Sequence, residues 1–164
     1  MERRIFLAGA ALAVMAPAIP SPARESLGRR TLVERFAATL SAHDLSAFGA
    51  LFADDYVNHQ ISAAAPAPPT GLTPKQATVG YFAARLAGMP DLQVAIESAV
   101  TADDKVAASF VYTGTHGGSY FGIAPTGRAL RFTSCDIFLV RNNLLAEHWG
   151  MGDIAGILAQ LRAR

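Results

Sequence analysis

Several side chains that could transfer protons lie within or beside apolar stretches of the C-terminal half of the chain. Asp136 lies between Phe132 and Phe138 in an apolar run, where an ionised carboxylate is costly unless it has a partner. His148 lies in the next apolar run, and His116 lies in a glycine-rich stretch. Desolvated acids and imidazoles are typical of sites that take and return protons, so these three residues are the candidate catalytic groups.

Two of these candidates also have a purely structural interpretation. Asp136 can lie on the outer face of its sheet, or it can form a salt bridge with Arg131 or Lys105. His116 can simply bond the backbone of its own loop. The residue types alone favour neither interpretation.

The glycine-rich stretch GTHGGSYFGIAPTGRALRF, residues 114–132, places His116 and Tyr120 among five glycines between two apolar runs. Glycines let a backbone turn tightly and approach a small molecule closely. No helix N-terminus follows the stretch, so a phosphate cradle is disfavoured. We therefore predict the rim of a pocket, with His116 and Tyr120 reaching inside.

Further polar and aromatic residues are candidates for lining that pocket. Several of them can instead have a structural role. Tyr112 and Tyr120 also suit contacts in the core or in a dimer, and Asp153 suits the N-cap of a helix. His59 suits an exposed helix end. The candidate substrate-binding residues are Tyr56, Asn58, His59, Tyr112, Tyr120, Phe132, Trp149, Met151 and Asp153.

The register of one hairpin decides whether His148 or Trp149 enters the pocket, because neighbouring residues of a strand face opposite sides. A two-residue turn at Asn142-Asn143 with a regular ladder puts Trp149 across from Asp136. A bulge near Gly150 puts His148 there instead.

Composition and spacing exclude several other classes of function. There is no His-x-His pair, no HExxH and no cysteine cluster, so no protein-bound metal is expected. The only cysteine, Cys135, has no intrachain partner for a disulfide. With 14 basic and 13 acidic residues and no basic stripe, nucleic acid is not an expected partner.

The elements that must position these residues are helices first, then strands, then a closing helix. Apolar periodicity and capping residues predict helices over about 31–43, from 44 to 52 and over 74–88. Residues 54–59 follow as a helix exit, and residues 63–71 as a loop that covers a pocket mouth. Period-two patterns predict strands from 92, through 106–112, over 131–141 and over 144–151, before a helix capped by Asp153.

This order is typical of an α+β domain with helices on one face of a bent sheet, whose concave side can hold a ligand. The 164 residues, 51% of them hydrophobic, suffice for one core. In the third strand Phe138 and Val140 alternate with Ile137 and Leu139, so both faces are apolar. An apolar face without helices over it predicts a homodimer through the sheet.

The first 23 residues have the pattern of an export signal. Two arginines precede the apolar run 5–15, which is shorter than the roughly 20 residues that span a bilayer, and prolines follow it. The string Arg3-Arg4-Ile5-Phe6-Leu7 is similar to a twin-arginine signal. We expect residues 24–164 to form one exported domain, periplasmic or secreted, with no stable membrane insertion after signal removal.

Residues 114–132, the hairpin with Glu147-His148-Trp149 and the tail Gly156-Ile157-Leu158-Ala159-Gln160-Leu161 resemble the SnoaL-like polyketide cyclases and ester cyclases. The resemblance covers roughly residues 29–161. It implies the cone of the nuclear transport factor 2-like superfamily, a curved antiparallel sheet wrapped by N-terminal helices with a C-terminal helix. It also implies a cofactor-free aldol-type cyclisation, or a related lyase or isomerase reaction, on a small hydrophobic carbonyl compound.

One position departs from the pattern of that family. The catalytic aspartate of the polyketide cyclases aligns with Gly150, which cannot transfer a proton. A histidine important in those enzymes aligns with Asp136, so a carboxylate has moved to the facing strand. Two hypotheses follow: an enzyme that uses Asp136 and His116 with His59 or His148, or a binding module that sequesters an apolar ligand without transforming it.

Overall fold

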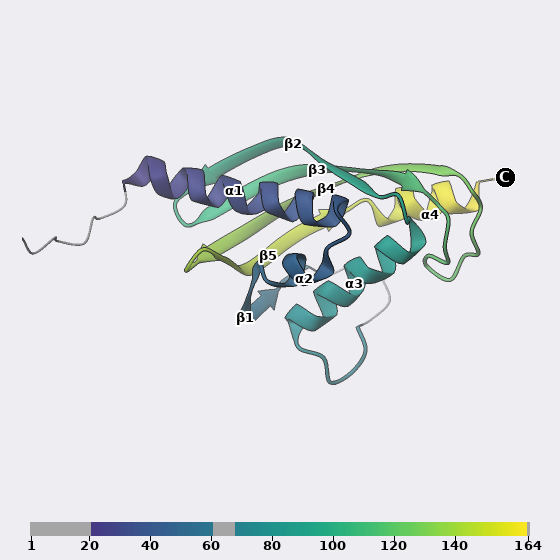
Figure 1. Cartoon of the computed structure of the whole chain (residues 1–164), viewed down its shortest axis with the longest axis horizontal. Helices are drawn as coiled ribbons and strands as arrows, with labels where there is room; N and C mark the ends of the chain where they lie inside the picture. Colours follow the sequence, from purple (N-terminus) through teal and green to yellow (C-terminus); the bar gives the residue numbers. More distant parts are fainter. Residues whose placement is uncertain (1–20, 61–67, 164) are drawn as a thin grey trace, which may run out of the picture.

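The computed structural model describes residues 21–60 and 68–163 (Figure 1). It contains four helices and one five-stranded sheet in those residues, which confirms the α+β prediction. The helices are α1 (Pro22–Ser41), α2 (Leu45–Gly49), α3 (Pro74–Gly88) and α4 (Ile154–Arg162). The strands are β1 (Phe52–Asn58), β2 (Gln93–Ala102), β3 (Lys105–Thr115), β4 (Ala129–Arg141) and β5 (Leu144–Gly152).

The sheet has the order β1-β5-β4-β3-β2. Strands β2 to β5 form an antiparallel meander, and β1 adds to the edge of β5 in parallel. The sheet is curved, α1 crosses it over β2 and β3, and α3 lies against β1 (Figure 1). The predicted hairpins and the closing helix are confirmed, and the sheet is mixed because of β1.

Local signals fix the ends of two helices as predicted. At α3 the Thr73 hydroxyl accepts from the Gln76 backbone N–H at 3.2 Å, and the Gln76 side chain accepts from the Thr73 N–H at 2.9 Å. At α4 the Asp153 carboxylate accepts from the Gly156 N–H at 2.8 Å. These caps satisfy backbone donors that would otherwise have no partner within the helix.

Two predicted element boundaries are wrong. The segment read as a helix exit is strand β1, because the Leu145 N–H of β5 donates to the Leu51 carbonyl and draws this segment onto the sheet edge. The first helix begins at Pro22, after the N-cap Ser21, rather than at Thr31. Thr31 lies inside α1 and its hydroxyl donates to the Leu27 carbonyl.

The predicted export signal falls largely on residues 1–20, outside the described residues. The predicted cleavage point after Ala23 falls in the first turn of α1. The export signal and its route stay predictions. No helix in the described part of the chain has both the length and the apolar character to span a membrane.

The core lies between the helices and the inner face of the sheet, and Phe36 of α1 is at its centre. The Phe36 ring contacts five other rings, with centroid distances of 5.0 to 6.5 Å. Those rings belong to Phe48, Phe52, Phe82, Phe110 and Phe138. Aromatic side chains from α1, α2, α3 and three strands therefore meet at one point.

The outer face of the sheet carries exposed apolar side chains. Ile137 of β4, Met151 of β5 and Val100 of β2 are 41%, 79% and 65% exposed. Cys135 of β4 is exposed on the same side of its strand as Ile137. The homodimer through the sheet stays a prediction.

Candidate active site

A bulge in the hairpin of β4 and β5 decides which side chain enters the interior. Asn142 and Asn143 both have positive φ and form the two-residue turn, and Arg141 pairs with Leu144 as expected. Between the pairs Val140↔Leu145 and Leu139↔Glu147, Ala146 is an extra residue. This bulge lies closer to the turn than the one considered near Gly150.

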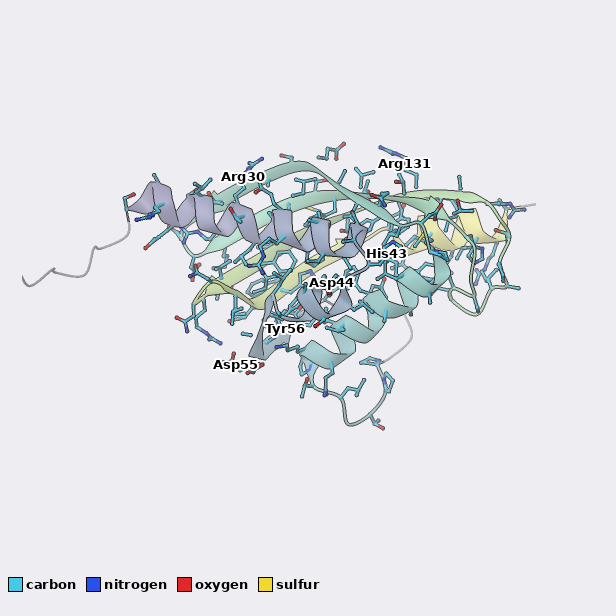
Figure 2. All side chains as sticks on the ribbon, viewed as in Figure 1. Arg30, His43, Asp44, Asp55, Tyr56 and Arg131 are labelled. Atoms are coloured by element: carbon cyan, nitrogen blue, oxygen red, sulfur yellow. The ribbon has the colours of Figure 1, made fainter. Side chains whose placement is uncertain are left out.

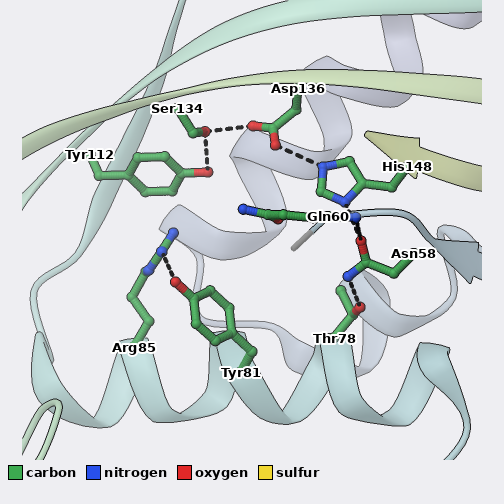
Figure 3. A network of polar contacts seen from close by, with 9 residues as sticks. All are labelled: Asn58, Gln60, Thr78, Tyr81, Arg85, Tyr112, Ser134, Asp136 and His148. Carbon is green, nitrogen blue, oxygen red and sulfur yellow. Dashed lines mark hydrogen bonds and ion pairs between the residues drawn. The ribbon is translucent and has the colours of Figure 1, made fainter. Parts of the chain in front are cut away.

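The bulge shifts the ladder so that Asp136 pairs with Gly150 and Phe138 pairs with His148. His148 and Gly150 therefore share the inner face with Asp136, while Trp149 pairs with Ile137 on the outer face. The His148 Nε2 lies 2.7 Å from the Asp136 Oδ1 (Figure 3). Both residues are buried, with 7% and 6% exposure, so this is a hydrogen-bonded pair largely shielded from water.

The tautomer of His148 is fixed by Asn58 of β1. The Gln60 backbone N–H donates to the Asn58 Oδ1 at 2.9 Å, which identifies that atom as the amide oxygen. The same oxygen lies 3.2 Å from the His148 Nδ1, so Nδ1 must carry a proton. The Nε2 nitrogen is then the atom that exchanges a proton with the Asp136 carboxylate.

The second oxygen of Asp136 is also engaged. The Ser134 hydroxyl donates to Oδ2 at 2.5 Å. The same Ser134 oxygen lies 3.4 Å from the Tyr112 hydroxyl, and a hydroxyl has one proton, so Ser134 can accept from Tyr112 while it donates to Asp136. Burial raises the pKa of Tyr112, so Tyr112 stays a neutral donor.

Gly150 provides the space in which the pair meets. A Cβ at this position would overlap the Asp136 Oδ1 and the His148 Nε2. Residue 150 therefore has to be glycine for these two atoms to reach hydrogen-bond distance.

We expect Gly150→Ala to separate the carboxylate from the imidazole while the fold persists, because the displaced atoms are side-chain ends. Proton-transfer activity should fall by about 10²-fold or more, since about 10² is the lower end expected for the loss of one well-placed acid–base group. The His148 ring signals in an NMR spectrum should shift with it. Gly28→Ala is the matched control, since a Cβ there meets no atom within contact distance and Gly28 does not line the cavity. Unchanged His148 signals in Gly150→Ala would contradict this account of Gly150.

The pair lies in the wall of a cavity of about 1050 Å³, large enough for a drug-sized molecule. Its wall is mostly apolar and is built by β1, α3, β3, β4 and β5, with Phe36 of α1, Ile154 of α4 and residues 68–72 completing it. Described polar residues in the wall are Tyr56, Asn58, Gln60, Thr78, Tyr81, Arg85, Tyr112, Ser134, Asp136 and His148. Figure 3 shows most of them facing one another across this space.

Tyr56 of β1 lines this cavity and has a buried hydroxyl without a hydrogen-bond partner among the described residues. Its side chain is 2% exposed, and its Oη has no hydrogen-bond partner among the described residues. The Thr78 hydroxyl is close by without meeting hydrogen-bond geometry. Burial raises the pKa of Tyr56, so the hydroxyl keeps its proton.

The salt bridges considered for Asp136 are not formed. The side chain of Arg131 lies on the opposite face of β4 from that of Asp136 and projects away from the body of the molecule (Figure 2). Lys105 pairs with Asp104 in the hairpin turn. Among the described residues, the charge partner of Asp136 is His148.

Of the residues expected in the pocket, His59, Trp149, Met151 and Asp153 lie outside the cavity. His59 stacks on Trp149 with ring centroids 4.5 Å apart and bonds Glu147 at 2.8 Å, outside the cavity. Met151 is exposed because the bulge places it on the outer face. Asp153 is used as the cap of α4.

The glycine-rich loop packs on the end of α3 instead of forming the cavity wall. The N–H groups of Gly117 and Gly118 donate to the Gly88 carbonyl, at 3.0 and 3.1 Å. The His116 Nδ1 accepts from the Thr126 N–H at 3.2 Å, so His116 bonds its own loop. Neither His116 nor Tyr120 is among the residues that line the cavity.

Phe132 also lies behind the cavity wall. It stacks on Tyr112 with ring centroids 5.0 Å apart. It supports the wall without lining it.

Five polar residues of the cavity wall were not predicted from the sequence: Gln60, Thr78, Tyr81, Arg85 and Ser134. Arg85 carries a signal that could have found it, because it lies three residues after Phe82 and so falls on the apolar stripe of α3. The signal for Ser134 is weaker. Ser134 is two residues from both Phe132 and Asp136, so all three side chains lie on the same, inner face of β4.

A sequence model of the family described as SnoaL-like polyketide cyclase matches residues 30–161. None of the curated proteins compared with the chain matches it. No group of three or more metal-ligating side chains occurs within residues 21–60 and 68–163.

Several solved structures have the same fold. The putative polyketide cyclase IdmH from Streptomyces antibioticus is 28% identical, with 82% of this chain and 99% of that chain covered and a TM-score of 0.70. TsrD from Streptomyces laurentii is 25% identical, with 84% of this chain and 97% of that chain covered and a TM-score of 0.71. A putative SnoaL-like polyketide cyclase from Jannaschia is 16% identical, with 90% and 99% covered and a TM-score of 0.72, and shows the fold alone.

Proposed function

The chain belongs to the SnoaL-like polyketide cyclase family, and we propose that it is a cofactor-free acid–base enzyme acting on a hydrophobic carbonyl compound. The observation that carries this proposal is the buried Asp136–His148 pair in the wall of a largely apolar cavity. A carboxylate shielded from water can take a proton from carbon next to a carbonyl group.

The first step assigned to this pair is proton removal. Asp136 takes the proton from the substrate carbon, and the electron pair of that C–H bond moves to the carbonyl oxygen to give an enolate. The pair acts as a base in the form that carries no shared proton. The transferred proton then lies in the 2.7 Å contact between the Asp136 Oδ1 and the His148 Nε2, because Nδ1 already carries a proton and bonds Asn58. The imidazolium then remains paired with the carboxylate.

In an aldol-type closure the enolate carbon next attacks a second carbonyl carbon of the same molecule. A carbon–carbon bond forms, and the second carbonyl oxygen becomes an alkoxide. The pair returns its proton to that oxygen, so no proton is gained or lost overall and no redox partner is needed. The cavity contributes by holding both carbonyl groups in one orientation.

The Tyr56 hydroxyl is the proposed donor to the enolate oxygen. It is buried, protonated and without a hydrogen-bond partner in the described part of the chain. A donor placed where negative charge develops stabilises the transition state more than the ground state.

Tyr56→Phe should lower turnover by about 10²-fold, because one oxyanion donor is lost. The free energy of unfolding should not fall, because the substitution removes no hydrogen bond to another described residue. Rate measurements and urea unfolding check the two expectations. Tyr81→Phe is the control for stability, because it removes the hydrogen bond that the Arg85 Nη2 donates to the Tyr81 hydroxyl at 2.8 Å. A Tyr56→Phe enzyme that is fully active would contradict the donor role.

The test of the proposed function uses 2-tetralone, a bicyclic ketone with acidic C–H groups, in D₂O. The protein should speed the replacement of these hydrogens by deuterium, followed by proton NMR, over buffer alone. Binding of 2-tetralone without faster exchange would instead favour the module that sequesters a ligand. The second candidate, a ligand-binding module without catalysis, is supported by Gly150. The polyketide cyclases that this chain resembles carry their catalytic acid at that position.

A further inference from the structure

Arg85 of α3 is a buried cation that the mechanism above does not use. It is 4% exposed and lines the same cavity as Asp136. Its Nε donates to the Tyr120 hydroxyl at 3.1 Å, and its Nη2 donates to the Tyr81 hydroxyl at 2.8 Å. Its Nη1 has no acceptor among the described residues, so part of its donor capacity is unused.

No carboxylate of residues 21–60 or 68–163 forms an ion pair with Arg85. Residues 61–67, Ile-Ser-Ala-Ala-Ala-Pro-Ala, contain no aspartate or glutamate. A guanidinium is charged at every physiological pH, and buried charges in proteins are normally paired. This cavity therefore carries a positive charge without an acidic partner from the described chain.

Four aromatic rings surround the guanidinium carbon and fix its position. The ring centroids of Tyr81, Phe82, Tyr112 and Phe132 lie 4.7 to 5.1 Å from it. Ring faces attract a cation, but they do not accept its N–H groups as a carboxylate does. The rings hold the planar group rigidly, which lowers the entropy lost when it binds an anion.

From this arrangement we propose that Arg85 binds a carboxylate of the substrate, so that the ligand of the cavity is a hydrophobic carboxylic acid. That this ligand is a substrate rests on the proposed function, whereas binding of its carboxylate by Arg85 does not. Arg85 comes from α3 and Asp136 from β4, with Tyr112 between them in Figure 3. The acid group then anchors one end of the ligand, and the carbon that loses its proton lies at the other end.

A carboxylate fits this site better than a phosphate does. Arg85 is the only arginine or lysine among the described residues that line the cavity. One guanidinium can neutralise the single charge of a carboxylate and match its two oxygens, whereas the second charge of a phosphate would be buried without a partner. The large apolar part of the wall matches a hydrocarbon or aromatic body.

Two isosteric probes test this proposal without any chemical reaction: naphthalene-2-carboxylate and naphthalene-2-carboxamide. Titration calorimetry on the full chain should give the acid an affinity at least about tenfold above that of the amide, the difference expected for a charge-assisted bond. Arg85→Gln should remove this preference and keep the affinity for the amide. Arg128→Gln, whose side chain bonds the Leu161 carbonyl outside the cavity, is the matched control and should keep the preference. Equal affinities for the two probes in the unmodified protein would overturn the proposal.

If Arg85→Gln does not fold, the unmodified protein still decides the question. The Nε–H signal of Arg85 in a nitrogen-15 NMR spectrum should move during titration with the acid and not with the amide. An unmoved signal in the acid titration overturns the proposal. A preference for the acid with no exchange of 2-tetralone would retain the Arg85 site and reject the enzyme, while exchange without the preference would reject Arg85 alone.

Discussion

Asp136→Asn is expected to lower the rate of 2-tetralone hydrogen exchange by about 10²- to 10⁴-fold, the range for loss of a positioned general base. Asparagine cannot take the proton, yet its amide has nearly the size of the carboxylate and can still contact Ser134 and His148. The melting temperature should therefore change far less than the rate. NMR exchange rates and thermal unfolding followed by circular dichroism measure the two quantities.

The matched control for this substitution is Asp104→Asn. Asp104 lies in the turn between β2 and β3 and pairs with the exposed Lys105, away from the cavity. Its replacement should leave both the rate and the melting temperature unchanged. Exchange at the full rate by Asp136→Asn, with the fold intact, would remove Asp136 as the base and the central assignment with it.

Phe36→Ala is expected to lower the free energy of unfolding by about 3–5 kcal/mol. The Phe36 ring is 2% exposed and contacts five other rings, so truncation removes apolar burial and leaves a cavity at the centre of the core. Domains of this size are stable by about 5–15 kcal/mol in total, so the variant should retain little stability. Urea unfolding gives the value.

Leu27→Ala on the same helix is the comparison for Phe36→Ala. Leu27 is 64% exposed, so its truncation should change the free energy of unfolding by about 0.5 kcal/mol or less. A loss below about 1 kcal/mol for Phe36→Ala would mean that the ring cluster is not the centre of the core.

Elements with strong local signals could be predicted from the sequence. The helix after Thr73 has both a capping box and a first-turn proline, and the turn at Asn142-Asn143 needs the positive φ that asparagine tolerates. Strand β1 could not be predicted, because its buried and exposed residues do not alternate. Its place is set by pairing with β5, which is far away in the sequence.

The site could be predicted in part for a related reason. Residue types pointed to Asp136 and His148, and the sequence left open whether His148 or Trp149 faces inward. Ala146 decides that question, since it is the extra residue of the bulge, and nothing in its type marks it as one. Arg85 was missed because a charged residue on an apolar helix stripe is ordinarily assigned to solvent.

Strand alternation in β4 places the sole thiol of the chain, Cys135, immediately before Asp136 and on the opposite side of the sheet. A maleimide fluorophore attached there would sit one backbone unit from the carboxylate without entering the cavity. Native protein thus offers a single, chemically unique labelling point from which ligand titrations can be followed optically, with no engineered cysteine.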